Sequence, residues 1–322
     1  MKFVAHKKLR SARKSIRHIA AGIPGWVDQY KECRKESVSK QEVQHMSKLI
    51  NKLQKDWDDL AKIDPMWAIC SDPTKLQNKW DAVEFFATGK QHILSVLETI
   101  RGLDVNLNTE TALDFGCGMG RLTQALAEEF NQVYGVDISP TMIERANQFN
   151  KFGEKCRYIL NSQEDLRIFN NNFFDFIYTY IVLQHMPSDL MQGYLREFVR
   201  ILKPGGILIF QVPIQRLEID TKKSYIKSLP IYHPHRVFNK LKGMSIGHDA
   251  TDRFYKLRKF GIPEIWLYKV FGFRPEIQMH TLDEEVISKL MMDMHTNIVH
   301  IEKREDKLTN MLWAHFVVVN PT

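Results

Sequence analysis

Apolar residues follow two different periods along the middle of the chain, and these periods predict its secondary structure. A short apolar run at residues 112–115 is typical of a strand buried on both faces. Apolar residues then recur at helical spacing through residues 119–130, and residues 132–136 predict a second strand. The same rhythm predicts further strands at 158–160, 174–180 and 207–212 and helices at 140–150 and 188–202. Such alternation is typical of a doubly wound, mostly parallel sheet.

Periodic segments also flank this region. Apolar residues recur every three or four positions from Val43 to Leu60, which predicts a long amphipathic helix. Residues 93–100 predict a helix just before the first strand. Near the end of the chain, residues 284–294 predict a helix, and residues 298–301 and 312–319 predict two closing strands. The pattern as a whole predicts an α/β fold with a seven-stranded sheet behind an N-terminal helical extension.

The segment after the fifth predicted strand breaks the rhythm and is rich in aromatic and basic residues. An insertion there would lie over the carboxyl ends of the strands, where ligands bind in open α/β sheets, so we expect a substrate-side cap. The predicted organisation is a basic and helical extension or lid (residues 1–105), a core (106–215), the insertion (216–275) and the C-terminal part of the core (276–322).

Composition adds a charge pattern to this picture. The chain has 322 residues, 44% of them hydrophobic and 26% charged, which is ordinary for a globular protein with a sizeable core. Residues 1–27 carry seven Lys or Arg and no acid, and residues 216–275 carry thirteen against five acids. These two basic segments predict contact with anionic lipid, nucleic acid or a phosphorylated substrate, with plain surface charge as an equal alternative.

The first 20 residues carry the apolar stripe Leu9, Ala12, Ile16 and Ala20. A helix peripheral to a membrane surface has this pattern, as do an organelle transit peptide and a disordered basic tail. No apolar run approaches the ~18 residues of a membrane span, and the N-terminus lacks a signal-peptide core. The four cysteines show neither pairing nor zinc-ligand spacing, so we expect no metal and a cytoplasmic protein, peripheral to a membrane if the first segment binds one.

Candidate chemistry begins at a glycine-rich turn after the first strand. Gly116, Gly118 and Gly120 lack a Cβ, so the backbone there turns sharply and a ligand can approach it. Asp137 ends the second strand, where a carboxylate accepts hydrogen bonds from both hydroxyls of a ribose. A nicotinamide dinucleotide is the weaker alternative, because the glycines are spaced G-x-G-x-G and Asp114 would repel a pyrophosphate.

Together with the motif LKPGG at residues 202–206, this stretch resembles the class I S-adenosylmethionine-dependent methyltransferases. The resemblance covers about residues 112–213 and implies a Rossmann-like sheet with S-adenosylmethionine as cofactor. It implies that Asp114 and the backbone of Gly116, Cys117, Gly118 and Gly120 hold the methionine end, and that Asp137 holds the ribose.

The resemblance also implies contacts for the remainder of the cofactor. Ile138 and Met142 pack against the adenine, and Gln163, Glu164 or Asp165 accepts a hydrogen bond from its amino group. Tyr180 or Ile181, at the end of the fourth strand, contributes backbone to the methionine. The implied lid candidates, with ordinary packing as the alternative, are Phe85, Phe86 and Thr88.

His185 is the candidate general base, because it lies just past the fourth strand and a histidine near neutrality can deprotonate a hydroxyl acceptor. The alternative is a histidine that orders its loop. Rival bases are His233, His235, His248, Asp249 and His280.

The wider pattern resembles a bacterial subgroup whose members accompany sugar and cell-surface polysaccharide biosynthesis. It implies methyl transfer to oxygen or nitrogen of a small molecule, sugar or glycan. RNA or protein methylation is the alternative that the basic segments favour, although an acceptor motif such as N-P-P-Y is missing after the fourth strand. A non-catalytic cofactor-binding scaffold is the other alternative, which the intact Asp114, glycine run and Asp137 disfavour.

Overall fold

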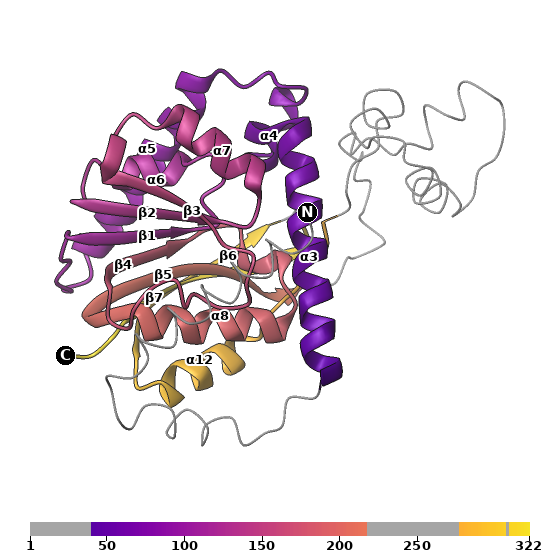
Figure 1. Cartoon of the computed structure of the whole chain (residues 1–322). Coiled ribbons are helices and arrows are strands. Elements are labelled where there is room, and N and C mark those ends of the chain that lie inside the picture. The colour runs from indigo at the N-terminus through magenta and orange to yellow at the C-terminus, as the bar shows by residue number, and fades with distance from the viewer. Residues whose placement is uncertain (1–39, 218–276, 307–308) are drawn as a thin grey trace, which may run out of the picture. The chain divides into compact units, whose positions relative to one another are not determined.

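The computed structural model describes residues 40–217, 277–306 and 309–322 (Figure 1). By its internal contacts the chain divides into two compact units, residues 1–48 and residues 49–322, and the site lies in the second unit. The predicted basic N-terminal stripe and the insertion, with His233, His235, His248 and Asp249, lie outside the described residues.

The described residues contain one seven-stranded sheet with the order β3-β2-β1-β4-β5-β7-β6. Strands β3, β2, β1, β4 and β5 pair in parallel, and β7 pairs antiparallel with both β5 and β6. The strands are β1 (Thr111–Phe115), β2 (Gln132–Asp137), β3 (Cys156–Leu160), β4 (Phe174–Thr179), β5 (Leu202–Arg216), β6 (Asn297–Asp306) and β7 (Met311–Val319). The predicted fold class is confirmed.

Helices cover both faces of the sheet. Figure 1 shows α5, α6 and α7 on one face and α8 and α12 on the other, which is the doubly wound arrangement. The helices are α3 (Lys40–Ile63), α4 (Pro65–Ile69), α5 (Ala82–Arg101), α6 (Arg121–Leu126), α7 (Pro140–Phe149), α8 (Ser188–Ile201) and α12 (Glu284–Asp293). Three 3-10 turns accompany them, η1 (Pro73–Lys75), η2 (Gly153–Lys155) and η3 (Leu183–His185).

Several predicted elements differ in length from the observed ones, among them α5, which begins at Ala82, and β6, which extends to Asp306. For two others the cause is visible in the structure. The helix predicted over residues 119–130 is helical as α6 only from Arg121 to Leu126, because the glycine turn occupies its first residues. The strand predicted over residues 207–212 begins already at Leu202, since the LKPGG backbone also pairs in the sheet. The amide of Gly205 donates to the carbonyl of Asn320 at 2.7 Å, so this motif is part of β5 and not only a connection.

The sheet is buried most deeply in its centre. Every residue of β4 is buried, because helices lie against both of its faces. On the α5 side, Phe176 and Tyr178 of β4 pack with Ile93 and Leu97 of α5 in the main hydrophobic cluster. This explains why the β4 sequence is apolar almost throughout instead of alternating.

One carboxylate joins the amino ends of three neighbouring strands. Asp175 of β4 accepts hydrogen bonds from the amide and hydroxyl of Thr111 at 2.9 and 2.6 Å and from Asn108 Nδ2 at 2.7 Å. The ammonium of Lys203 in β5 lies 2.7 Å from the same carboxylate. The buried charge therefore has partners in β1 and β5, which fixes the register of the three strands.

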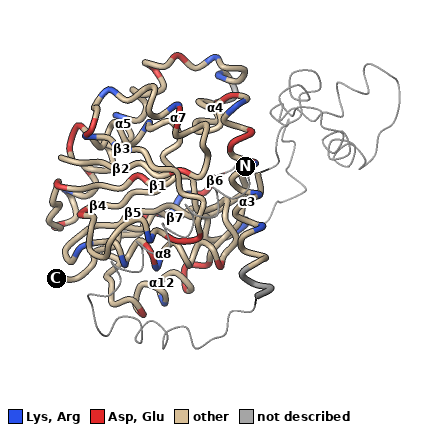
Figure 2. Tube along the Cα trace, viewed as in Figure 1, with Lys and Arg blue, Asp and Glu red and all other residues tan. Residues whose placement is uncertain are grey.

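Charge is distributed evenly over the described residues. Figure 2 shows Lys and Arg interspersed with Asp and Glu along the trace. Among the described residues no helix combines the length and the apolar character needed to cross a membrane.

Candidate active site at the carboxyl ends of β1, β2 and β4

The glycine turn joins β1 to α6 with three left-handed residues. Gly116, Gly118 and Gly120 have φ angles of 78°, 53° and 82°, a conformation that residues with a Cβ rarely adopt. A Cβ on Gly116 would collide with Val182, and one on Gly118 would lie 2.5 Å from Cδ1 of Ile69. Side chains of α4 and of the loop after β4 thus approach these glycines closely, and the predicted approach of a ligand remains a prediction.

Asp137 closes the other side of this turn. Its Oδ2 accepts from the Gly118 amide and its Oδ1 from the Ser139 amide, both at 2.8 Å. Burial raises the pKa of Asp137, while these amides act in the opposite direction. The N-cap of α7 is Ser139, whose Oγ accepts from the Met142 amide, so Asp137 is not needed as a cap. Each carboxylate oxygen keeps a lone pair for a further donor, such as a ribose hydroxyl.

Asp114 lies beneath the turn and is only 2% exposed. Its Oδ2 accepts from the Thr123 hydroxyl at 2.6 Å. Burial raises the pKa of Asp114 to about 6, against the opposing effects of Thr123 and the Arg121 charge. Cys117 is buried beside it, and burial likewise raises the pKa of its thiol, so its amide is the group available to the turn.

The residues predicted to face the adenine lie where α3 and α5 meet the end of β2. The carbonyl of Ile138 accepts from Gln54 Nε2 of α3 at 3.0 Å. Met142 is buried in one cluster with Phe85 and Met119, and Phe86 packs against this cluster. Phe85 and Phe86 contact each other edge to face with ring centroids 5.4 Å apart. The lid prediction for this segment remains a prediction.

The loop after β3 is ordered by a residue that the sequence analysis passed over. Asn161 is buried, donates to the carbonyl of Asp165 at 2.8 Å and accepts from the amide of Gln163 at 3.3 Å. The Tyr194 hydroxyl donates to the carbonyl of Gln163 at 2.6 Å. Gln163 and Glu164 are exposed, whereas Asp165 forms an ion pair with Arg167. All three candidates therefore lie in one loop beyond β3, and none is singled out.

Ile181 has an unusual backbone conformation for a β-branched residue. Its φ is +58° and its side chain is 41% exposed. Such strain typically costs ~1–3 kcal/mol and clusters where ligands bind. The preceding Tyr180 is held by ring contacts with His92 and His315, at centroid distances of 4.3 and 5.8 Å. This conformation supports a backbone role at the end of β4.

His185 has protein partners on both ring nitrogens. Nδ1 lies 3.3 Å from the carbonyl of Gln278, which only accepts, so Nδ1 carries the proton. Nε2 then accepts from the side-chain amide of Gln184 at 3.1 Å. The Trp57 ring packs edge to face against the imidazole, with ring centroids 4.9 Å apart. Burial lowers the pKa of His185 to about 4. These contacts order the loop after β4, and the base role remains a prediction.

The rival base His280 lies two residues after Gln278, whose carbonyl contacts His185. The amide of His280 donates to the carbonyl of Gln184 at 2.7 Å. Residues 278–280 thus lie along the loop that carries His185, which the sequence spacing did not predict.

Asp58 of α3 is a further residue that the sequence analysis missed. Its Oδ1 accepts from the Thr141 amide at 2.9 Å and from the Ser139 hydroxyl at 3.0 Å, and its Oδ2 pairs with Lys62. Burial acts to raise the pKa of Asp58, but Lys62, Thr141 and Ser139 outweigh it and lower the pKa to about 2. A carboxylate of α3 therefore binds the N-terminus of α7 directly beside Asp137.

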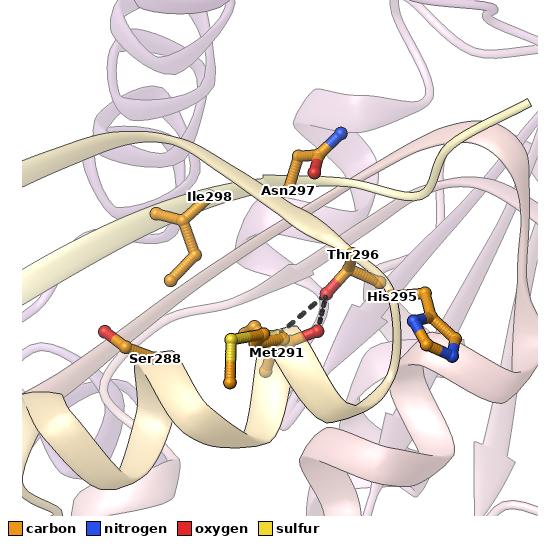
Figure 3. A pocket seen from close by; sticks show the side chains of 7 residues that line it. Ser288, Met291, His295, Thr296, Asn297 and Ile298 are labelled. Carbon is orange, nitrogen blue, oxygen red and sulfur yellow. Dashed lines mark hydrogen bonds between the residues drawn. The ribbon is translucent and has the colours of Figure 1, made fainter.

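The described residues also form a surface hollow of about 530 Å³ between α12 and the start of β6. In Figure 3 the Thr296 hydroxyl points at Met291, to whose carbonyl and sulfur it donates at 3.0 and 3.5 Å. Because β6 runs in the same direction as β1, its start lies at the amino ends of the strands. The hollow is therefore separate from the glycine turn.

Comparison with known proteins agrees with this geometry. Residues 113–210 match the family described as a methyltransferase domain. A curated relative, 2-methyl-6-phytyl-1,4-hydroquinone methyltransferase of Synechocystis sp., is 28% identical over 160 residues, which cover 47% of this chain and 48% of the relative. Ubiquinone biosynthesis O-methyltransferase of Xanthomonas campestris pv. campestris is 32% identical over 139 residues, which cover 41% of this chain and 55% of the relative. The chain thus spans about half the length of the curated relatives it matches.

Solved structures extend the likeness over more of the chain. Magnesium protoporphyrin IX methyltransferase from Synechocystis PCC 6803, with bound SAH, has a TM-score of 0.51 at 17% identity and covers 84% of this chain and 99% of its own. A SAM-dependent methyltransferase from Leishmania major has a TM-score of 0.51 at 12% identity, and the match covers 84% of this chain and 82% of that protein. The fold is that of the class I S-adenosylmethionine-dependent methyltransferases. Residues 113–210 of this chain are therefore similar in sequence to the methyltransferase domain family.

Proposed function

We propose that this protein is an S-adenosylmethionine-dependent methyltransferase that transfers a methyl group to oxygen or nitrogen of a small-molecule acceptor. One observation carries the proposal. Asp137 ends β2 with both oxygens oriented by the amides of Gly118 and Ser139, directly beside a turn of left-handed glycines. A ribose at the carboxyl end of β2 would find a carboxylate acceptor already in position.

The residues around the turn suit the ribose, the adenine and the methionine parts of the cofactor. Asp137 would hold the ribose, Met142 and Ile138 would pack the adenine, and Asp114 and the backbone at Ile181 would face the methionine. The cofactor supplies a methyl group already activated on a sulfonium. The task of the chain is therefore to bind and align, and alignment alone can be worth ~7–11 kcal/mol of barrier.

The curated relatives support a small-molecule acceptor. Their names refer to 2-methyl-6-phytyl-1,4-hydroquinone and to ubiquinone biosynthesis. A sugar or glycan acceptor is the finer proposal, which rests on the sequence resemblance. Contact of the basic segments with an anionic membrane or nucleic acid is a separate proposal that rests on their charge.

Calorimetric titration of S-adenosylmethionine and S-adenosylhomocysteine tests the cofactor assignment. We expect wild-type binding to weaken at least tenfold, about 1.4 kcal/mol, in Asp137→Ala, because a charge-assisted ribose contact is lost. Asp293→Ala, an exposed acid on α12, is the matched control and should bind as the wild type does. A folded wild type that binds neither compound would reject the proposal and leave the scaffold alternative.

The acceptor class is tested by transfer of labelled methyl from S-adenosylmethionine to pools of phenols, sugars, glycans and RNA. Transfer to the small molecules or glycans supports the proposal. Transfer confined to RNA, with affinity that falls steeply as salt rises, would instead establish the nucleic-acid alternative.

A further inference from the structure

Arg121 is a buried cation for which the described residues offer almost no partner. It is the first residue of α6, directly after Gly120, and is only 6% exposed. Its NH1 donates one long hydrogen bond of 3.3 Å to the Thr88 hydroxyl, and its Nε has no partner. No carboxylate of the described residues lies within ion-pair distance of it. A guanidinium has five N–H donors, so most of its capacity is left over.

The groups around this guanidinium do not neutralise it. Burial, with the Arg121 charge acting in the same direction, lowers the pKa of His92 to about 4, so this imidazole is neutral. Burial raises the pKa values of Tyr180 and Cys70, with Arg121 acting against burial in both, so they too are uncharged near neutrality. The Arg121 charge lowers the pKa of Asp114 against the effect of burial, and the carboxylate of Asp114 already accepts a hydrogen bond from Thr123.

An isolated buried charge is unfavourable unless something compensates it. The aliphatic stem of Arg121 is nevertheless packed closely, because α5 passes over it at Gly89. A Cβ on Gly89 would lie 2.8 Å from Cγ of Arg121 and would collide with its carbonyl oxygen. The fold therefore restrains the start of the Arg121 side chain, and the hydrogen bond from NH1 to Thr88 orients the guanidinium at its end.

Arg121 lies on the side of the glycine turn that faces away from Asp137. Asp137 is the last residue of β2 and Tyr180 follows β4, and these strands flank β1 on opposite sides. Arg121 contacts Thr88 of α5 and influences Tyr180, which places its charge on the β4 side of the glycine turn. A ligand with its ribose at Asp137 that extends across the turn would bring its far end to this side.

We propose that Arg121, supported by Thr88, binds the α-carboxylate of the methionine part of S-adenosylmethionine, an inference that rests on the proposed function. The methionine end is a zwitterion and needs groups of both signs. Asp114 is the expected partner of its ammonium, and the planar guanidinium fork matches a carboxylate in two parallel hydrogen bonds. The carboxylate is the anionic group that this cofactor carries, and it would compensate the unpaired charge of Arg121.

The test compares S-adenosylmethionine with its decarboxylated analogue, which differs only in the carboxylate, by calorimetric titration. The wild type should bind S-adenosylmethionine at least tenfold more tightly than the analogue. Arg121→Gln should lose at least tenfold in affinity for S-adenosylmethionine and remain within twofold for the analogue. Arg196→Gln removes an exposed arginine of α8 and should leave both affinities unchanged.

Several results would overturn the inference. These are an Arg121→Gln protein that binds S-adenosylmethionine within twofold of wild type, one that loses both ligands equally, and a wild type that binds both compounds equally well. A wild type that binds neither compound would overturn the proposed function together with this inference. The three results above would overturn the inference alone.

Stability supplies an independent readout. Because Arg121→Gln removes an unpaired buried charge, its melting temperature without ligand should not fall, whereas the stabilisation by S-adenosylmethionine should be lost. If this variant does not fold, Arg121→Lys keeps the charge without the planar fork. It should lose affinity for S-adenosylmethionine and not for the analogue; an unchanged preference for the carboxylate would contradict the inference.

Discussion

Replacing Asp58 by Asn tests how α3 is attached to α7. The carboxylate of α3 accepts from the first turn of α7, through Thr141 and Ser139, and pairs with Lys62. Asparagine keeps one acceptor oxygen in the same place and removes only the charge. The variant therefore isolates the electrostatic part of the contact, including the favourable effect of an anion at a helix N-terminus.

The magnitude follows from the pKa. The surrounding groups lower the pKa of Asp58 from 3.8 to about 2, and the side chain is only 14% exposed, so solvent screens it little. This pKa is lowered by nearly two, which at ~1.4 kcal/mol per pKa unit gives about 2.5 kcal/mol of stability at pH 7. Because the folded pKa lies below the unfolded one, this contribution is complete above about pH 5. It falls to about half near pH 3 and disappears below pH 2.

Urea unfolding of wild type and Asp58→Asn at pH 7 and pH 3.5, followed by tryptophan fluorescence, measures this contribution. Asp59→Asn is the matched control, because Asp59 forms an i,i+4 ion pair with Lys55 on the same helix. Such a pair contributes ~0.5 kcal/mol or less. Equal stabilities of Asp58→Asn and wild type at pH 7, or a difference that does not shrink at pH 3.5, would refute the reasoning.

Three further predictions concern the core, the turn and the loop after β4. Asp175→Ala should cost about 3 kcal/mol, measured by urea unfolding, because it removes the acceptor of four buried or half-buried donors. Gly116→Ala should lower the melting temperature and weaken cofactor binding, because the added Cβ strains a φ of 78° and meets Val182. Gly193→Ala, which has open space inside α8, should instead stabilise by ~0.5–1 kcal/mol, and an equal loss in both variants would contradict the strain argument. Burial lowers the pKa of His185 to about 4, so its neutral form stabilises the fold above pH 6.5 and this stability is lost as the pH falls toward 4. His185→Asn should therefore flatten the decrease in unfolding free energy between pH 7 and pH 5, and an unchanged decrease would count against the burial of this ring.

The fold could be predicted from the sequence because its signals are local. Apolar runs such as that of β4 follow directly from burial by helices on both faces. Ser139 caps α7 by accepting from the Met142 amide, a contact of this local kind because the two residues are three apart in the chain. The confirmed order of strands and helices follows from the same alternation, whereas strand ends such as Leu202 depend on pairing with distant neighbours.

The parts of the site that could not be predicted depend on contacts between distant segments. Asp58 lies 81 residues from Ser139, and nothing in the amphipathic pattern of α3 shows that a polar residue there meets α7. Ile69 and Val182 were missed as the side chains that cover the glycine turn for the same reason. Arg121 is a helix-starting arginine by sequence, and only its burial distinguishes it from a solvated one.

The two ends of the sheet differ in how completely their buried polar groups are paired. At the amino ends, Asp175 has hydrogen-bond partners on every side. At the carboxyl ends, buried polar atoms without a hydrogen-bond partner gather instead. Among the described residues these are Arg121 Nε, Tyr158 Oη, Thr179 Oγ1, Gln184 Oε1 and Gln211 Oε1. Gln211 follows the β5 residue that pairs with Thr179, so the two lie at the same level of the sheet.

Unpaired buried donors and acceptors reduce stability, and each calls for a physical explanation. Their position at the end of the sheet where the glycine turn, Asp137 and the strained Ile181 also lie gives that explanation. Groups that a ligand satisfies must remain unsatisfied by the protein alone. The amino ends of the strands therefore stabilise the fold, whereas the carboxyl ends give up part of that stability, as the proposed binding of cofactor and acceptor there would require.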